Sequence, residues 1–204
     1  MNRRREMIVG TKNWDNRNCY YVQTNNPTDE YLRKTMASGW LVSCGPTAAV
    51  NCMAAMGYDL DIVCKGGYRP QPEEILMDYF NDPANYAKFR EVRKDIDPGR
   101  YAGNEVPQYY PVATREVFAV TSTFLWIHDF GKIQAFLKDG KAVQICLKAP
   151  GHFLAVVAYD DETESLIYND SWPGRHEDGD GFNCRMGRYE YDKNVEPYAI
   201  VYGN

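Results

Sequence analysis

Residues 43–57 read SCGPTAAVNCMAAMG. The segment is rich in alanine, carries no charged side chain, has a proline near its start and ends on a glycine. Proline is favoured in the first turn of a helix and glycine just past the last, so this pattern predicts a helix that begins at Cys44 and ends just before Gly57. A helix with no charged face is buried on nearly all sides, which places this one in the core.

Cys44, at the start of this predicted helix, has the features of a nucleophile. The positive end of the helix dipole and the unpaired amides of the first turn both favour the thiolate, which is the reactive form. The same amides can donate to an oxyanion on an attacked carbonyl. We expect Gly45 to let a substrate backbone approach without a Cβ in the way. A buried core cysteine is the alternative that this motif leaves open.

The rest of the chain shows helical patterns followed by strand patterns. Residues 72–96 are typical of two helices broken near Pro83, and Asp129 is typical of an N-cap for a helix that ends at Gly140. Residues 112–127 fit either a strand or a buried helix. Helices followed by an antiparallel sheet indicate an α+β fold. The predicted strands span 143–147, 153–159, 166–168 and 198–202.

Length and charge limit the classes of protein. The 204 residues suit one large domain, and the net charge of −5 argues against a nucleic-acid binder. No apolar run approaches the roughly 20 residues of a membrane span. The basic start at 3–5 lacks a following apolar stretch, so we expect no signal peptide. The protein is then cytoplasmic in the cell that makes it, unless lysis or a partner releases it.

The six cysteines form no C-x-x-C pair, so we expect neither a structural zinc site nor a disulfide framework. The acidic loop at 175–181 lacks the spacing of a calcium-binding EF-hand and is more simply a solvated loop. We therefore expect no metal and no organic cofactor.

A nucleophilic cysteine needs a base, and the chain has three histidines. His128 precedes a predicted helix cap, and His176 lies in a polar loop that we expect to be exposed. His152 opens the most apolar predicted strand, so it lies at a sheet end, where it can face a cleft. We take His152 as the candidate base, and a core histidine bonded to a backbone carbonyl is the alternative.

A base needs a group that fixes its tautomer. Asp170 ends the strand that should pair with the His152 strand, and a hairpin brings the start of one strand beside the end of the next. We therefore expect Asp170 within reach of His152, with the side chain of Asn169 pointing the other way. An aspartate that merely opens a turn is the alternative. Gln23 is a candidate second oxyanion donor, although a solvated surface glutamine has the same signature.

The order of these residues resembles that of the papain-like cysteine peptidases, and more narrowly their C39-like, bacteriocin-processing branch. In that branch the nucleophile lies in a Cys-Gly-Pro motif, the histidine in a Gly-His-Tyr/Phe motif and the third member in an Asp-Pro motif. The resemblance implies that Cys44 is the nucleophile, His152 the base and Asp170 the orienting carboxylate. It also gives Gln23 the place of the oxyanion-hole glutamine.

Two features depart from that family pattern. Asp170 is followed by Ser171-Trp172-Pro173 instead of directly by proline, which leaves the aspartate itself intact. Gln23 lies farther from the cysteine than the family's glutamine usually does, so the resemblance requires an inserted loop at about 25–38.

The resemblance implies a papain-like, C39-like fold, with N-terminal helices packed on a C-terminal antiparallel sheet in a single domain over 1–204. It leaves a helical insertion of unknown role at about 58–127, which we expect to determine substrate choice. The implied function is cofactor-free hydrolysis of an amide bond in a peptide, a protein or a peptidoglycan stem peptide. A thioester-forming acyltransferase of the transglutaminase kind and a catalytically silent peptide-binding module remain alternatives.

Overall fold

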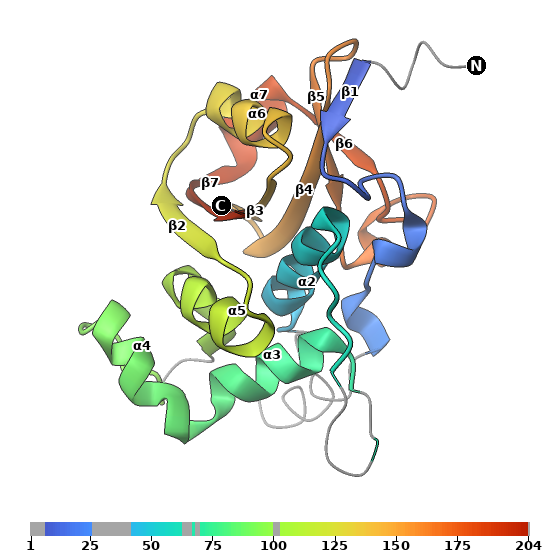
Figure 1. The fold of residues 1–204 in the computed structure, drawn as a ribbon. Coiled ribbons are helices and arrows are strands. Elements are labelled where there is room, and N and C mark those ends of the chain that lie inside the picture. The colour runs from blue at the N-terminus through green and yellow to red at the C-terminus, as the bar shows by residue number, and fades with distance from the viewer. Residues whose placement is uncertain (1–6, 26–41, 63–66, 68–69, 100–102, 204) are drawn as a thin grey trace.

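The computed structural model of the chain describes residues 7–25, 42–62, 67, 70–99 and 103–203. The basic N-terminal arm, Cys64 and nearly all of the predicted inserted loop lie outside these residues. A central sheet has helices packed on both of its faces (Figure 1). Within the described ranges, no helix combines the length and apolarity needed to cross a membrane.

The sheet has seven strands in the order β2-β7-β3-β4-β5-β6, and β1 pairs with the part of β4 that extends beyond the start of β3. Every pairing is antiparallel, which confirms the predicted α+β fold. The predicted strands correspond to β3, β4, β5 and β7. The bounds are β1 Ile8–Gly10, β2 Ser122–Trp126, β3 Ala142–Leu147, β4 His152–Asp160, β5 Ser165–Asn169, β6 Cys184–Gly187 and β7 Val195–Tyr202.

The observed helices match the predicted ones closely. The first helix is closed by Gly57, whose φ of 91° gives a left-handed C-cap. The break near Pro83 separates two helices, and the side chain of Asp129 caps a third by accepting from the amide of Lys132. The helices are α2 Cys44–Met56, α3 Pro72–Asn81, α4 Tyr86–Val92, α5 Tyr110–Phe118, α6 Phe130–Lys138 and α7 Arg188–Asn194.

The segment 112–127, which fitted either a helix or a strand, contains both. Helix α5 ends at Ala119, which adopts a left-handed conformation with a φ of 55°, and strand β2 follows and pairs with β7. The end of the stretch that we expected to be a helical insertion is therefore an edge strand of the sheet. Strand β6 and helix α7 had no counterpart in the sequence analysis, because residues 184–194 lack a long apolar period.

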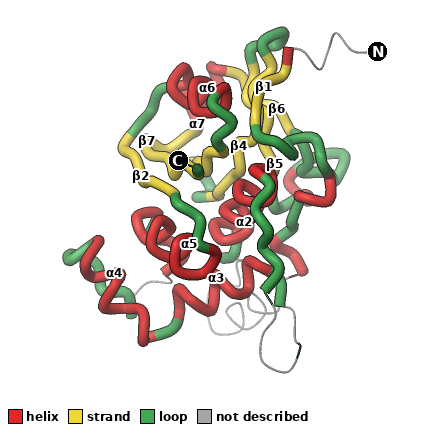
Figure 2. Tube along the Cα trace, viewed as in Figure 1, coloured by secondary structure: helices red, strands yellow, loops and turns green. Residues whose placement is uncertain are grey.

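Two layers of helices bury the two faces of the sheet (Figure 2). Helices α2, α3 and α5 pack on one face, and α6 and α7 pack on the other. Strand β4 is buried along its whole length, because residues such as Ala155 and Val157 face α2 while Leu154 and Val156 face α6. This burial on both faces fixes the end of β4, and with it the position of His152.

Candidate active site

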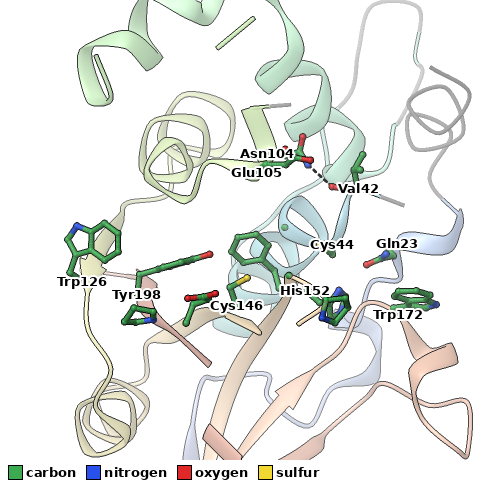
Figure 3. A pocket seen from close by; sticks show the side chains of 16 residues that line it. Gln23, Val42, Cys44, Asn104, Glu105, Trp126, Cys146, His152, Trp172 and Tyr198 are labelled. Atoms are coloured by element: carbon green, nitrogen blue, oxygen red, sulfur yellow. Dashed lines mark hydrogen bonds between the residues drawn. The ribbon is translucent and has the colours of Figure 1, made fainter. Parts of the chain in front are cut away.

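A pocket of about 600 Å³ opens where the start of α2 meets the start of β4. Cys44 and His152 lie in its middle (Figure 3). Gln23 and Trp172 stand at one end of the pocket, and Tyr198 and Trp126 stand at the other. The pocket thus gathers three of the four residues that the sequence analysis selected.

Cys44 is the first residue of α2 and is half-buried. The amides of Cys44 and Gly45 begin the helix and have no carbonyl of an earlier turn to bond. Pro46 has no N–H, and the N–H of Thr47 donates to the carbonyl of Ser43 at 2.9 Å. The helix start therefore presents amide donors close to the thiol, as an oxyanion site requires.

Gly45 has a packing role that the sequence analysis did not predict. A Cβ at this position would overlap with the hydroxyl of Tyr110, which is fully buried and donates to the carbonyl of Asn104 at 2.8 Å. The carbonyl of Gly45 accepts a 3.0 Å hydrogen bond from Nε2 of Gln144 on β3. Close packing of α2 against Tyr110 therefore requires a glycine here, and Gly45 also lines the pocket.

Asp170 lies beside His152, as the predicted hairpin required. Nε2 of His152 is 2.6 Å from Oδ1 of Asp170, and the two side chains are 4% and 3% exposed. This bond leaves Nδ1 as the ring nitrogen that can exchange a proton with a thiol. Asn169 points away, because its Oδ1 accepts from the amide of Asn183.

The pKa values of this pair move apart. Burial disfavours the imidazolium, but hydrogen bonding to Asp170 and to Cys44 outweighs it, so the pKa of His152 is raised above its ordinary value. Burial also disfavours the carboxylate of Asp170, but the interaction with His152 outweighs it, and the pKa of Asp170 is lowered. Both pKa shifts favour the charged forms, so the pair is an ion pair of imidazolium and carboxylate.

A protein-family model described as the Peptidase_C39 like family matches residues 17–196. The chain belongs to this family. The match confirms the predicted C39-like, papain-like relationship and spans all four candidate residues as well as the stretch 58–127. No curated protein matches the chain.

The segment after β5 of this C39-like chain holds several parts of the site together. The Oγ of Ser171 donates to Oε1 of Gln23 at 2.7 Å, and the N–H of Gln23 donates to the carbonyl of Ser171 at 2.9 Å. The amide of Trp172 donates to Oδ1 of Asp170, and its ring lies edge-on to His152, 6.2 Å between centroids. These residues, which we treated as a departure from the family motif, connect Asp170, Gln23 and His152.

Gln23 is 1% exposed, unlike the solvated glutamine that was its alternative. Because Oε1 accepts from Ser171, the donor group Nε2 is the part of the amide available to a ligand in the pocket. Asn51 on α2 fixes the same segment, since its side chain accepts from the N–H of Tyr21 and donates to the carbonyl of Tyr21. The sequence analysis missed Asn51, although a polar amide side chain within so apolar a helix was a signal that could have identified it.

The other two histidines differ in their surroundings. His128 is exposed and stacks on Tyr191, 5.3 Å between ring centroids. His176, which we expected in an exposed loop, is half-buried, and its Nε2 lies 3.1 Å from Oδ2 of Asp170. Its ring also lies 3.7 Å from Sγ of Cys184. The polar loop therefore folds back against the carboxylate that His152 uses.

Two acidic side chains of that loop, Asp178 and Asp180, have partners within the protein. Asp180 forms a two-pronged ion pair with Arg17, at 2.8 and 2.9 Å, and Asp178 accepts from the amide of Asp180. Among the described residues, no group of three or more His, Cys, Asp or Glu side chains has the arrangement of a metal site. The chemistry of the pocket is that of a thiol, an imidazole, a carboxylate and amide donors.

Proposed function

We propose that the protein is a cysteine peptidase that hydrolyses an amide bond, with Cys44 as nucleophile, His152 as acid and base, Asp170 as the orienting carboxylate and Gln23 as an oxyanion donor. The observation that carries this proposal is the buried 2.6 Å bond between His152 and Asp170 beside a cysteine that begins a helix. Membership in the C39-like family supports the same class of reaction.

In the acylation step, Nδ1 of His152 takes the proton from Sγ of Cys44, and the thiolate attacks the carbonyl carbon of the substrate. The negative charge moves to the carbonyl oxygen, where the amide of Cys44 and Nε2 of Gln23 donate hydrogen bonds to it. The tetrahedral intermediate collapses as the C–N bond breaks, and His152 gives its proton to the leaving amine. A thioester on Cys44 remains.

In the second step, His152 takes a proton from a water molecule, and the resulting hydroxide attacks the thioester. Collapse of the new tetrahedral intermediate releases a carboxylic acid and returns the proton to the thiolate of Cys44. Asp170 stays ionised throughout and stabilises the imidazolium, which the depressed pKa of Asp170 favours. The ring of Trp172 stands edge-on to that of His152 beside the bond between His152 and Asp170.

The decisive experiment is labelling of the native protein with iodoacetamide across pH, with peptide mapping of all six cysteines. Burial raises the pKa of Cys19, that of Cys146 to about 11 and that of Cys184 to about 12, so these thiols are protonated near neutral pH. We expect Cys44 to react fast below pH 7 and the His152→Ala variant to react slowly. Labelling of Cys44 no faster than Cys19 or Cys184 would favour a catalytically silent binding module.

Product analysis separates hydrolysis from acyl transfer. Digestion of a mixed peptide pool should yield fragments with a new free carboxylate, and a Cys44→Ala variant should yield none. Fragments joined to an added amine, with little free carboxylate, would identify an acyltransferase instead.

A further inference from the structure

Acidic side chains outnumber basic ones in the lining of the pocket. Its sixteen lining residues include Glu105 and Glu196 and contain no lysine or arginine. No ion pair within the described ranges involves either glutamate. The lining residue able to carry positive charge is His152, and Asp170 already balances it. Two carboxylates in a concave site attract cations.

The two glutamates come from different parts of the fold. Glu105 ends the turn Gly103–Glu105 before α5. Glu196 lies on strand β7, next to Pro197. Glu196 is half-buried. Glu105 is exposed, although partial desolvation raises the pKa of its carboxyl. The pocket is therefore lined by one carboxylate from the helical layer and one from the sheet.

Trp126 and Tyr198 form an aromatic wall at one end of the pocket (Figure 3), and Glu196 lies two residues before Tyr198 on β7. Trp126 is 72% exposed although it is one of the largest apolar side chains of the chain. Its ring stands nearly perpendicular to that of Tyr198, at 88° and 6.1 Å between centroids, and Phe124 supports both. An aromatic wall next to carboxylates fits a long alkyl stem that ends in a cation, because the rings contact the stem and attract the charge.

We propose that the pocket selects peptides that carry a lysine or arginine side chain close to the scissile bond, with the stem against Trp126 and Tyr198 and the cation attracted by Glu196 and Glu105. This inference rests on the proposed function, since it names the substrate class of the same site. An apolar side chain would bury carboxylates without a partner, and an acidic one would meet like charges.

The test compares peptides that are identical except for Lys, Arg, Met or Glu at one position, moved through the four positions on each side of the scissile bond. At one position we expect kcat/KM for Lys or Arg to exceed that for Met by about tenfold, and Glu to be the poorest. The preference should weaken as salt rises, because ions screen charge attraction. Calorimetry of the same peptides binding to the Cys44→Ala variant measures the preference without turnover.

Variants assign the preference to the glutamates. Glu196→Gln and Glu105→Gln should each reduce the Lys-over-Met ratio, while Glu196→Lys should turn the preference toward Glu. Glu190→Gln, on the exposed face of α7 and outside the pocket, is the matched control and should leave the ratio unchanged.

The outcomes separate the two proposals. Equal rates and equal affinities for Lys and Met peptides would overturn the cation preference while peptidase activity stands. The preference would also be overturned if the Lys-over-Met ratio were the same in both glutamate variants as in Glu190→Gln. No cleavage of any peptide together with slow labelling of Cys44 would instead overturn the proposed function. In that case the calorimetric comparison on Cys44→Ala still decides whether the pocket selects cations.

Discussion

Nε2 of His176 lies 3.1 Å from Oδ2 of Asp170, on the carboxylate oxygen that His152 does not use. Because the two imidazoles approach different oxygens, one carboxylate can accept from both at once. A hydrogen bond from His176 draws charge away from Asp170 and weakens its hold on the imidazolium of His152. His176 is therefore placed to tune the pKa of His152 without touching the pocket.

This relationship predicts a pH effect. His176→Ala should shift the alkaline limb of the kcat/KM profile to higher pH, because Asp170 then stabilises the imidazolium of His152 more strongly. His176→Gln, which restores a neutral donor, should return the limb toward that of the wild type. His128→Ala is the control, since His128 stacks on Tyr191 away from the pocket. A profile unchanged or shifted downward in His176→Ala would contradict the role.

Local patterns predicted the parts of the site that local structure determines. The helix that begins at Cys44 follows from composition and from its proline and glycine. The proximity of His152 and Asp170 follows from the register of one hairpin, whose two strands pair Ala155 with Asn169 and Asp160 with Ser165. Both depend on residues fewer than twenty positions apart.

Contacts between distant segments could not be predicted in this way. Ser171 and Gln23 are 148 positions apart, and the loop that carries His176 is folded back by an ion pair between Arg17 and Asp180 across 163 positions. A polar loop has the same composition whether it is solvated or packed on a carboxylate, so His176 looked exposed. Similarly, nothing local to Gly45 indicates that a tyrosine hydroxyl packs against it.

Asp170→Asn should change stability with pH in a defined window. The pKa of His152 is raised, so its contribution to the free energy of unfolding is present below about 6.5 and is lost as the pH rises through the folded value. The pKa of Asp170 is lowered, so its contribution is present above about 3.9 and is lost as the pH falls through the folded value. The loss in Asp170→Asn should be largest between these two values.

Denaturant unfolding of both proteins across pH 3 to 9 checks this window. Asp178→Asn is the control, because Asp178 is exposed and its carboxylate accepts from the backbone amide of Asp180. A difference between wild type and Asp170→Asn that stays constant over the range would show that the pair does not titrate as the structure implies.

Gln23→Ala should separate oxyanion stabilisation from activation of the thiol. Loss of one oxyanion donor costs roughly 100- to 1,000-fold in kcat, while labelling of Cys44 by iodoacetamide should stay within about threefold of the wild type, because His152 and Asp170 are intact. Ser171→Ala leaves Oε1 of Gln23 without its donor and should give a smaller loss of kcat, with about 1–3 kcal/mol of stability lost. Equal losses of kcat and of labelling rate in Gln23→Ala would mean that it supports the fold of the site instead.

The contact between Gly45 and Tyr110 predicts coupling between two substitutions. Alanine is a better helix former than glycine by about 1 kcal/mol, but a Cβ at position 45 would overlap with the hydroxyl of Tyr110, so Gly45→Ala should destabilise the protein by about 1–3 kcal/mol. In a Tyr110→Phe background the hydroxyl is absent, and the same substitution should cost less, since the ring carbon and the carbonyl of Asn104 remain at contact distance.

A double-mutant cycle measured by denaturant unfolding tests this coupling. Gly131→Ala, in the first turn of α6, is the control, because a Cβ there has only the carboxylate of Asp129 nearby, at 3.4 Å. Gly45→Ala should also reduce the rate at which Cys44 is labelled, since the shift that relieves the overlap moves the helix start away from His152. Additive losses in the cycle would show that α2 relaxes without the help of Tyr110, and the glycine would then need another explanation.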